Sequence, residues 1–147
     1  MSVVNELINA QGESLEFGNY ELGAKTKKDG FEFQGDIYKI KTFNEITKLE
    51  KNGMFVYESV PGTAVHGFKA DENDVTFVVE GPENASITLE LEPETEYKVH
   101  VDDVYVGKNK TNLGGKMSIS VDLEEGRPVK VAVSYTHLRA HETLMNL

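Results

Sequence analysis

Residues 117–123 read Met-Ser-Ile-Ser-Val-Asp-Leu, with an apolar side chain at every second position. This alternation is typical of a β-strand that buries one face, because successive side chains of a strand point to opposite sides. The same two-residue period recurs at residues 75–79, 87–91, 97–101 and 129–133. Together with the segments at 64–68 and 104–106 it predicts about seven short strands, the pattern of an antiparallel β-sandwich.

The N-terminal half predicts a short helix followed by a β-meander. Val3, Val4, Leu7 and Ile8 have the spacing of one helix face, over two turns at most. Further along, Asn52-Gly53 predicts a two-residue type I′ hairpin that pairs Leu49 with Val56 and Lys48 with Tyr57.

The fold class that follows is all-β. We expect residues 1–60 to form the short helix and the β-meander. Residues 61–133 are expected to form a β-sandwich of the immunoglobulin-like or fibronectin-like kind. The boundary is placed at Val60-Pro61-Gly62, where the strand pattern breaks.

Composition restricts the classes of function. The chain has 147 residues, no cysteine and a net charge of −10. A disulfide framework and thiolate metal sites are therefore excluded, and nucleic acid and anionic membranes are poor partners. The N-terminus carries Glu6 where a signal peptide has basic residues, and its apolar stretch is short, so we expect a cytoplasmic protein.

The C-terminal tail differs from the rest of the chain. Residues 133–143, Val-Ser-Tyr-Thr-His-Leu-Arg-Ala-His-Glu-Thr, resemble a translated frame of a transposase-type sequencing adapter, and residues 144–147 fit its continuation. We therefore expect 134–147 to be a non-native tail. His137 and His141 have the four-residue spacing of a zinc-binding pair on a helix, but on this interpretation they are not a site.

No catalytic constellation is apparent in the remaining chain. His66 and His100 have no ligand or triad partner at a recognisable spacing, and Ser59 and Ser118 lack the Gly-x-Ser-x-Gly context of a hydrolase. The acidic cluster at residues 71–74 is explained by the preference of Asp for turns rather than by a calcium site. We therefore expect no catalytic residue, no metal and no cofactor.

Aromatic residues are the better candidates for binding. They crowd the N-terminal half, and an aromatic ring exposed on a sheet face can stack on a sugar ring or a partner. Tyr38 and Tyr57 are the predicted contact residues, for a carbohydrate or for a protein partner.

Several stretches resemble a set of short bacterial β-rich proteins that are sometimes labelled endosialidase. They are Phe17-Gly-Asn-Tyr20, the run from Gly35 to Gly53, and residues 55–63, 97–103 and 110–121, so the resemblance covers nearly all of residues 1–132. The label would imply cleavage of polysialic acid on a large propeller, which a chain of this length cannot build. The pattern Thr111-Asn-x-x-Gly-Lys is also similar to that of β-sandwich modules appended to glycan-active enzymes.

Three hypotheses of function follow from the sequence. The first is a non-catalytic interaction or accessory protein that binds another protein or other copies of itself. The second is a carbohydrate-binding accessory module. The third is an endosialidase-like glycan hydrolase, which the resemblance alone implies.

Overall fold

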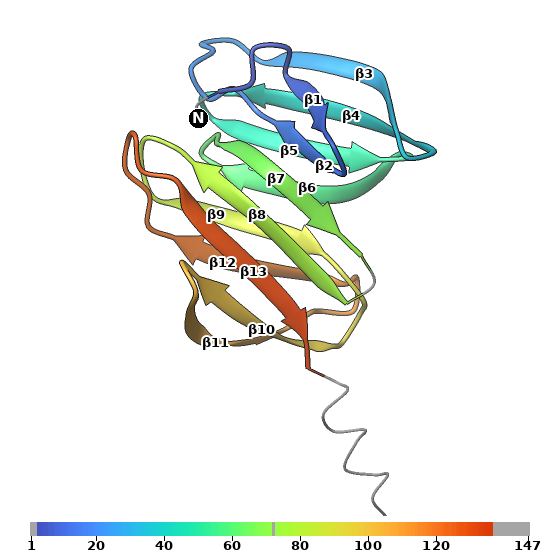
Figure 1. Ribbon diagram of the computed structural model, residues 1–147, viewed down its shortest axis with the longest axis vertical. Coiled ribbons are helices and arrows are strands. Elements are labelled where there is room, and N and C mark those ends of the chain that lie inside the picture. Colours follow the sequence, from blue (N-terminus) through green and yellow to red (C-terminus); the bar gives the residue numbers. More distant parts are fainter. Residues whose placement is uncertain (1–2, 72, 137–147) are drawn as a thin grey trace, which may run out of the picture.

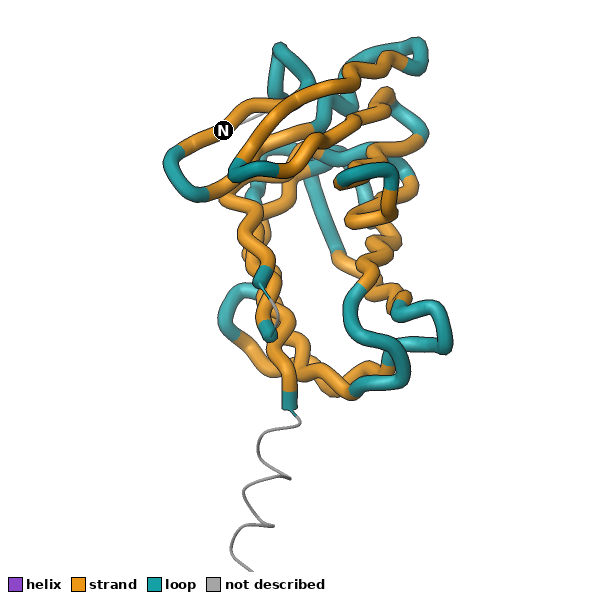
Figure 2. Tube along the Cα trace, turned by 90° about the vertical axis from the view of Figure 1, so that its right-hand side faces the viewer, coloured by secondary structure: helices purple, strands orange, loops and turns teal. Residues whose placement is uncertain are grey.

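The computed structural model describes residues 3–71 and 73–136, and within these ranges the chain forms thirteen strands and no helix. The strands make two antiparallel sheets that face each other as the layers of a sandwich (Figures 1 and 2). The predicted all-β class and antiparallel sandwich are confirmed. In the described part of the chain, no helix is long and apolar enough to cross a membrane.

The seven-stranded sheet has the order β1 (Ile8–Gln11), β2 (Ser14–Phe17), β7 (Ala64–Ala70), β8 (Asp74–Glu80), β13 (Val129–Tyr135), β10 (Glu96–Val101) and β11 (Val104–Lys110). The six-stranded sheet has the order β12 (Lys116–Val121), β9 (Ala85–Glu90), β6 (Met54–Val60), β5 (Ile46–Lys51), β4 (Asp36–Phe43) and β3 (Thr26–Phe33).

The strand order differs from the predicted immunoglobulin-like arrangement. In an immunoglobulin domain the last strand lies at the edge of its sheet. Here β13, the last described strand, lies between β8 and β10 and is hydrogen-bonded to both. The boundary expected at residue 60 separates strands that are neighbours in space, since β2 pairs with β7 and β6 pairs with β9.

The predicted N-terminal helix is wrong. The Leu7 amide donates to the Val4 carbonyl in a tight turn, and Leu7 has a φ of 73°, outside the helical range. The next residue, Ile8, begins β1 and pairs with Phe17 of β2. A two-turn helix is marginal by itself, whereas the strand buries Ile8 completely against the sheet.

The Asn52-Gly53 hairpin is confirmed, but its register is not the predicted one. Both turn residues have positive φ, and Lys51 pairs with Met54. A bulge then shifts the ladder, so that Leu49 pairs with Tyr57 and Val56 becomes the extra residue. The shift turns Leu49 and Tyr57 to the same buried face, and neither has exposed surface.

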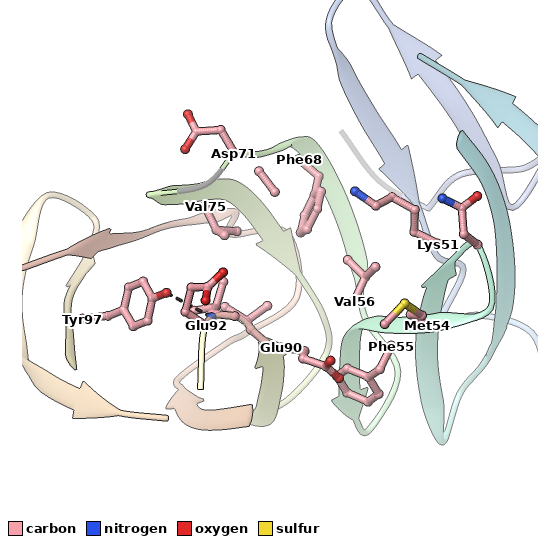
Figure 3. Close-up of a pocket in the computed structure, with 14 residues that line it drawn as sticks. Lys51, Met54, Phe55, Val56, Phe68, Asp71, Val75, Glu90, Glu92 and Tyr97 are labelled. Atoms are coloured by element: carbon pink, nitrogen blue, oxygen red, sulfur yellow. Dashed lines mark hydrogen bonds between the residues drawn. The ribbon is translucent and has the colours of Figure 1, made fainter. Parts of the chain in front are cut away.

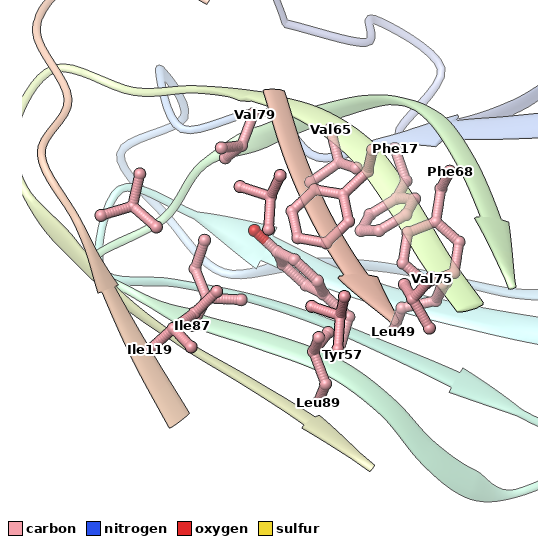
Figure 4. Packing of buried hydrophobic residues seen from close by; sticks show 14 of the residues in the cluster. Phe17, Leu49, Tyr57, Val65, Phe68, Val75, Val79, Ile87, Leu89 and Ile119 are labelled. Atoms are coloured by element: carbon pink, nitrogen blue, oxygen red, sulfur yellow. The ribbon is translucent and has the colours of Figure 1, made fainter. Parts of the chain in front are cut away.

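The core lies between the sheets and contains the residues that the alternation predicted (Figure 4). Tyr57 stands at its centre, with its ring edge-on to Phe17, Phe68 and Phe77 at centroid distances of 5.2, 6.4 and 5.7 Å. T-shaped pairs of this kind stabilise a core beyond the area they bury.

A network of buried hydroxyl groups fills one end of the space between the sheets. Thr63 Oγ1 lies 2.8 Å from the hydroxyl oxygens of both Tyr57 and Ser59, and Thr47 Oγ1 donates to the Thr63 carbonyl. Thr42 and Thr47 are joined by a further hydroxyl pair at 2.8 Å. Buried polar groups must be paired, and these pair with one another.

Strand β13 extends two residues past the end expected at residue 133. Tyr135 pairs with Tyr97 of β10, and the two rings lie 5.7 Å apart. Thr136 donates through Oγ1 to the carbonyl of Glu96. The predicted histidine pair, His137 and His141, lies outside the described residues.

Candidate ligand-binding cleft

A cleft opens between the two sheets (Figure 3). It lies where β5 and β7 end and β6 begins, whereas the hydroxyl network lies at the other ends of these strands. It has a volume of about 540 Å³. Its walls are apolar and come from both sheets: Phe68 and Val75 belong to the seven-stranded sheet, and Val56 and Leu89 belong to the six-stranded sheet.

A second compartment of about 420 Å³ adjoins the first. The two have five lining residues in common, namely Lys51, Val56, Phe68, Ala70 and Asp71. The second compartment has a more polar lining, which includes Glu13, Gln34, Asp74 and Thr76, together with the rings of Phe33 and Tyr38. We refer to the two as the apolar and the polar compartment of one cleft.

Two turns form the rim of the cleft. In the β5–β6 hairpin the Asn52 side chain accepts the Ile37 amide at 2.9 Å and donates to Asp36 at 2.8 Å. In the β7–β8 turn the Asp71 carboxylate accepts the amides of Asn73 and Asp74, both at 2.8 Å. These bonds favour the ionised carboxylate and lower the pKa of Asp71.

Charges of both signs lie around the apolar compartment. Lys51 and Asp71 are exposed on one side, and Glu90 and Glu92 line the other. Tyr97 closes the inner end, where its hydroxyl accepts the Glu92 amide at 3.2 Å. Burial raises the pKa of this hydroxyl, so it stays protonated and retains a proton to donate.

The structure separates the two predicted contact residues. Tyr38 lines the polar compartment, although only 9% of its surface is exposed. Tyr57 has no exposed surface, and burial raises the pKa of its hydroxyl. A ligand cannot reach Tyr57, so this residue is not a contact residue. Because of the bulge at Val56, the Tyr57 side chain lies in the core and not on the outer face of the sheet.

The other residues considered from the sequence are not brought together. His66 lies 3.1 Å from the Glu16 carboxylate on the seven-stranded sheet, whereas the His100 ring lies 5.5 Å from that of Tyr105. Ser59 is buried in the hydroxyl network. Among the described residues, no three His, Asp or Glu side chains are grouped as a metal site would require.

Sequence reasoning missed most of the cleft. Phe68 and Val75 follow the strand pattern and were indistinguishable from other core positions. Met54 follows the Asn-Gly turn directly and is 63% exposed, an unusual place for a large apolar side chain. A large apolar residue directly after the Asn-Gly turn, Met54, is the one feature of the sequence that could have indicated the rim.

No protein-family model, curated protein or solved structure matches this chain.

Proposed function

We propose that this chain is a non-catalytic interaction protein that holds an apolar segment of a protein partner in its cleft. The observation that carries the proposal is the apolar compartment, which is walled by both sheets and open to solvent. Binding sites of this kind combine apolar walls with a few polar groups that fix orientation. Charges of both signs surround the compartment. They suit a peptide with charged flanking residues better than they suit a ligand of uniform charge.

The proposal is tested by selecting peptides from a random display library against the whole chain. We expect the selected peptides to share one or two large apolar anchors, because such anchors carry most of the energy of an interface. Met54→Asp should weaken their binding by about tenfold or more, which is about 1.4 kcal/mol.

Ser118→Asp is the matched control, because it introduces the same charge on an exposed strand position away from the cleft. Selected peptides that bind equally well to the Met54→Asp variant would contradict the proposal. So would a library that yields no binder.

The second candidate function is carbohydrate binding, and the polar compartment favours it. Tyr38 and Phe33 present aromatic surface there, beside amide and carboxylate groups that can pair with sugar hydroxyls. We expect a glycan array to report binding that falls for Gln34→Ala and Asp74→Ala but not for Ser118→Asp. An array without signal would contradict carbohydrate binding.

Hydrolysis is the third candidate and has a separate readout. Polysialic acid and other glycans are incubated with the purified chain, and the lengths of the products are measured. Shortening that is lost in a single carboxylate variant such as Glu92→Gln would replace the non-catalytic proposal.

A further inference from the structure

Three lysines lie side by side across three adjacent strands of the six-stranded sheet. Lys27 of β3 is the register partner of Lys41 of β4, and Lys41 is in turn the register partner of Lys48 of β5. Register partners point to the same face of a sheet. Ile40 and Thr42, on either side of Lys41, are buried between the sheets, so the three lysines lie on the outer face. We refer to them as the lysine row.

Two further lysines lie beside the lysine row. Lys39 is two residues before Lys41 on β4 and therefore has the same outward direction. Lys25 immediately precedes β3. Desolvation, followed by the charges of Lys25 and of the two row partners, lowers the pKa of the Lys41 ammonium group. Within the described ranges, Lys48 is the only one of the five that forms an ion pair, with Glu50 at 3.6 Å.

Protection of a sheet edge does not explain the lysine row. Lysines commonly prevent pairing at edge strands, but only β3 is an edge here, and β4 and β5 are bonded on both sides. Like charges directly opposite each other destabilise a sheet. The chain has 25 acidic and 15 basic side chains, so this face has the opposite sign to the chain as a whole. A ligand with several negative charges would remove the repulsion within the row.

The surroundings of the lysine row indicate which anion fits. Phe43 and Ile46 are register partners two residues away from the row on β4 and β5, and both rows of side chains share the outer face. Phe43 and Ile46 are only half-buried, so apolar surface lies next to the lysines. On β6, Glu58 is the register partner of Lys48 and ends the row. The positive surface is thus three strands wide, or about 10 Å. A long polyanion would extend past it onto a chain whose net charge is −10, whereas a short segment would not.

We propose that the lysine row binds a short acidic segment of a protein partner. Asp or Glu carboxylates of the segment lie over the ammonium groups, and an apolar side chain lies against Phe43 and Ile46. A single exposed ion pair contributes little, so binding requires several lysines that act together. No residue of the row lines either compartment of the cleft, so this site is separate from the one proposed for an apolar segment.

Fluorescence anisotropy of a labelled hexaglutamate peptide with a C-terminal phenylalanine, titrated with the whole chain, tests the proposal. The titration is made at an ionic strength of about 0.1 M, where charges more than about 10 Å away are largely screened. We expect saturable binding, and none for a peptide in which glutamine replaces every glutamate. Lys41→Gln together with Lys48→Gln should weaken binding by about fivefold or more, because two of the ion pairs are lost.

Two control variants separate the lysine row from net charge and from folding. Lys108→Gln together with Lys110→Gln removes the same charge from β11 of the other sheet and should leave the affinity unchanged. Lys41→Arg together with Lys48→Arg keeps both charges and should bind as the parent chain does. Absence of saturable binding, or equal weakening by the two pairs of glutamine substitutions, would overturn the proposal.

Two further measurements identify the ligand class and the site. A single-stranded oligonucleotide should bind more weakly than hexaglutamate, and tighter binding would overturn the proposal in favour of a nucleic-acid ligand. Met54→Ala, at the rim of the cleft, should bind hexaglutamate as the parent chain does. Loss of hexaglutamate binding in this variant would place the acidic segment in the cleft and not on the lysine row. Failure of the cleft proposal and failure of this one are therefore distinguishable.

Discussion

The two ends of the sandwich differ in what fills the space between the sheets. At the closed end, hydroxyl groups from β4, β5 and β6 meet Thr63 and pair with one another. At the open end, apolar side chains from both sheets line a space that stays open, the cleft of about 540 Å³. The comparison indicates that the hydroxyl network joins the sheets at one end, whereas the other end is open to solvent.

The closed end also depends on close backbone contacts. A Cβ atom on Gly62 would meet the carbonyl oxygen of Phe43, and one on Gly18 would meet the carbonyl oxygen of Thr63. Only glycine allows the chain to pass so close to its neighbours, and Gly18 also has a φ of 102°. At the open end, Ala70 lines both compartments and contributes only a methyl group.

The largest expected effect follows from breaking the closed end at Gly62. Gly62→Ala forces a methyl group against the Phe43 carbonyl and should lower the free energy of unfolding by about 3 kcal/mol or more. Urea denaturation measures the change. Gly23→Ala is the matched control, since nothing lies within 4 Å of that position and its φ is ordinary. Equal stability of the two variants would show that the closed end tolerates expansion.

Thr63→Val should have the next largest effect. It keeps the shape of the side chain but leaves the buried hydroxyls of Tyr57 and Ser59 without this partner, a loss of about 1–3 kcal/mol. The control is Thr88→Val, because the Thr88–Ser118 hydroxyl pair is exposed and water can replace it. Equal shifts of the urea midpoint in the two variants would contradict a stabilising role of the buried hydroxyl network.

Acid should loosen the turn at Asp71 on the rim of the open end. The folded pKa of Asp71 lies below its ordinary value of 3.8, so its bonds to the Asn73 and Asp74 amides are complete above that pH. They are lost as the pH falls through the lowered pKa. The NMR signals of these two amides should therefore move below about pH 3.8, before signals from the hydroxyl network move. Asp71→Asn should remove this response.

The smallest effect is expected for Met54→Ala at the rim. Met54 is 63% exposed, and substitutions at such positions change stability by no more than about 0.5 kcal/mol. Thermal unfolding should not distinguish this variant from the parent chain, although its affinity for selected peptides should fall. A clear loss of stability would mean that the rim contributes to folding and that the two ends are less different than described.

The sequence was sufficient for most of the strands but not for the cleft. Alternation at residues such as Val129, Val131 and Val133 predicts one buried face, and all three are buried. The same pattern cannot show which end of the strand faces an open space. The misplacement of Tyr57 has a similar cause, because a single extra residue at Val56 reverses the face of all that follows. The helix prediction failed because β1 gains a pairing partner that lies outside the local pattern.

The position of β13 has a consequence for synthesis. This strand occupies an interior place in the seven-stranded sheet and bonds on one side to β8 and on the other to β10. Without residues 129–135 the strand order leaves this sheet as two parts that nothing joins, and β8 and β10 each lack one partner. Pairing between segments so distant along the chain is slow. The nascent chain therefore has its greatest exposure to mispairing just before synthesis reaches β13, when a chaperone would protect it most.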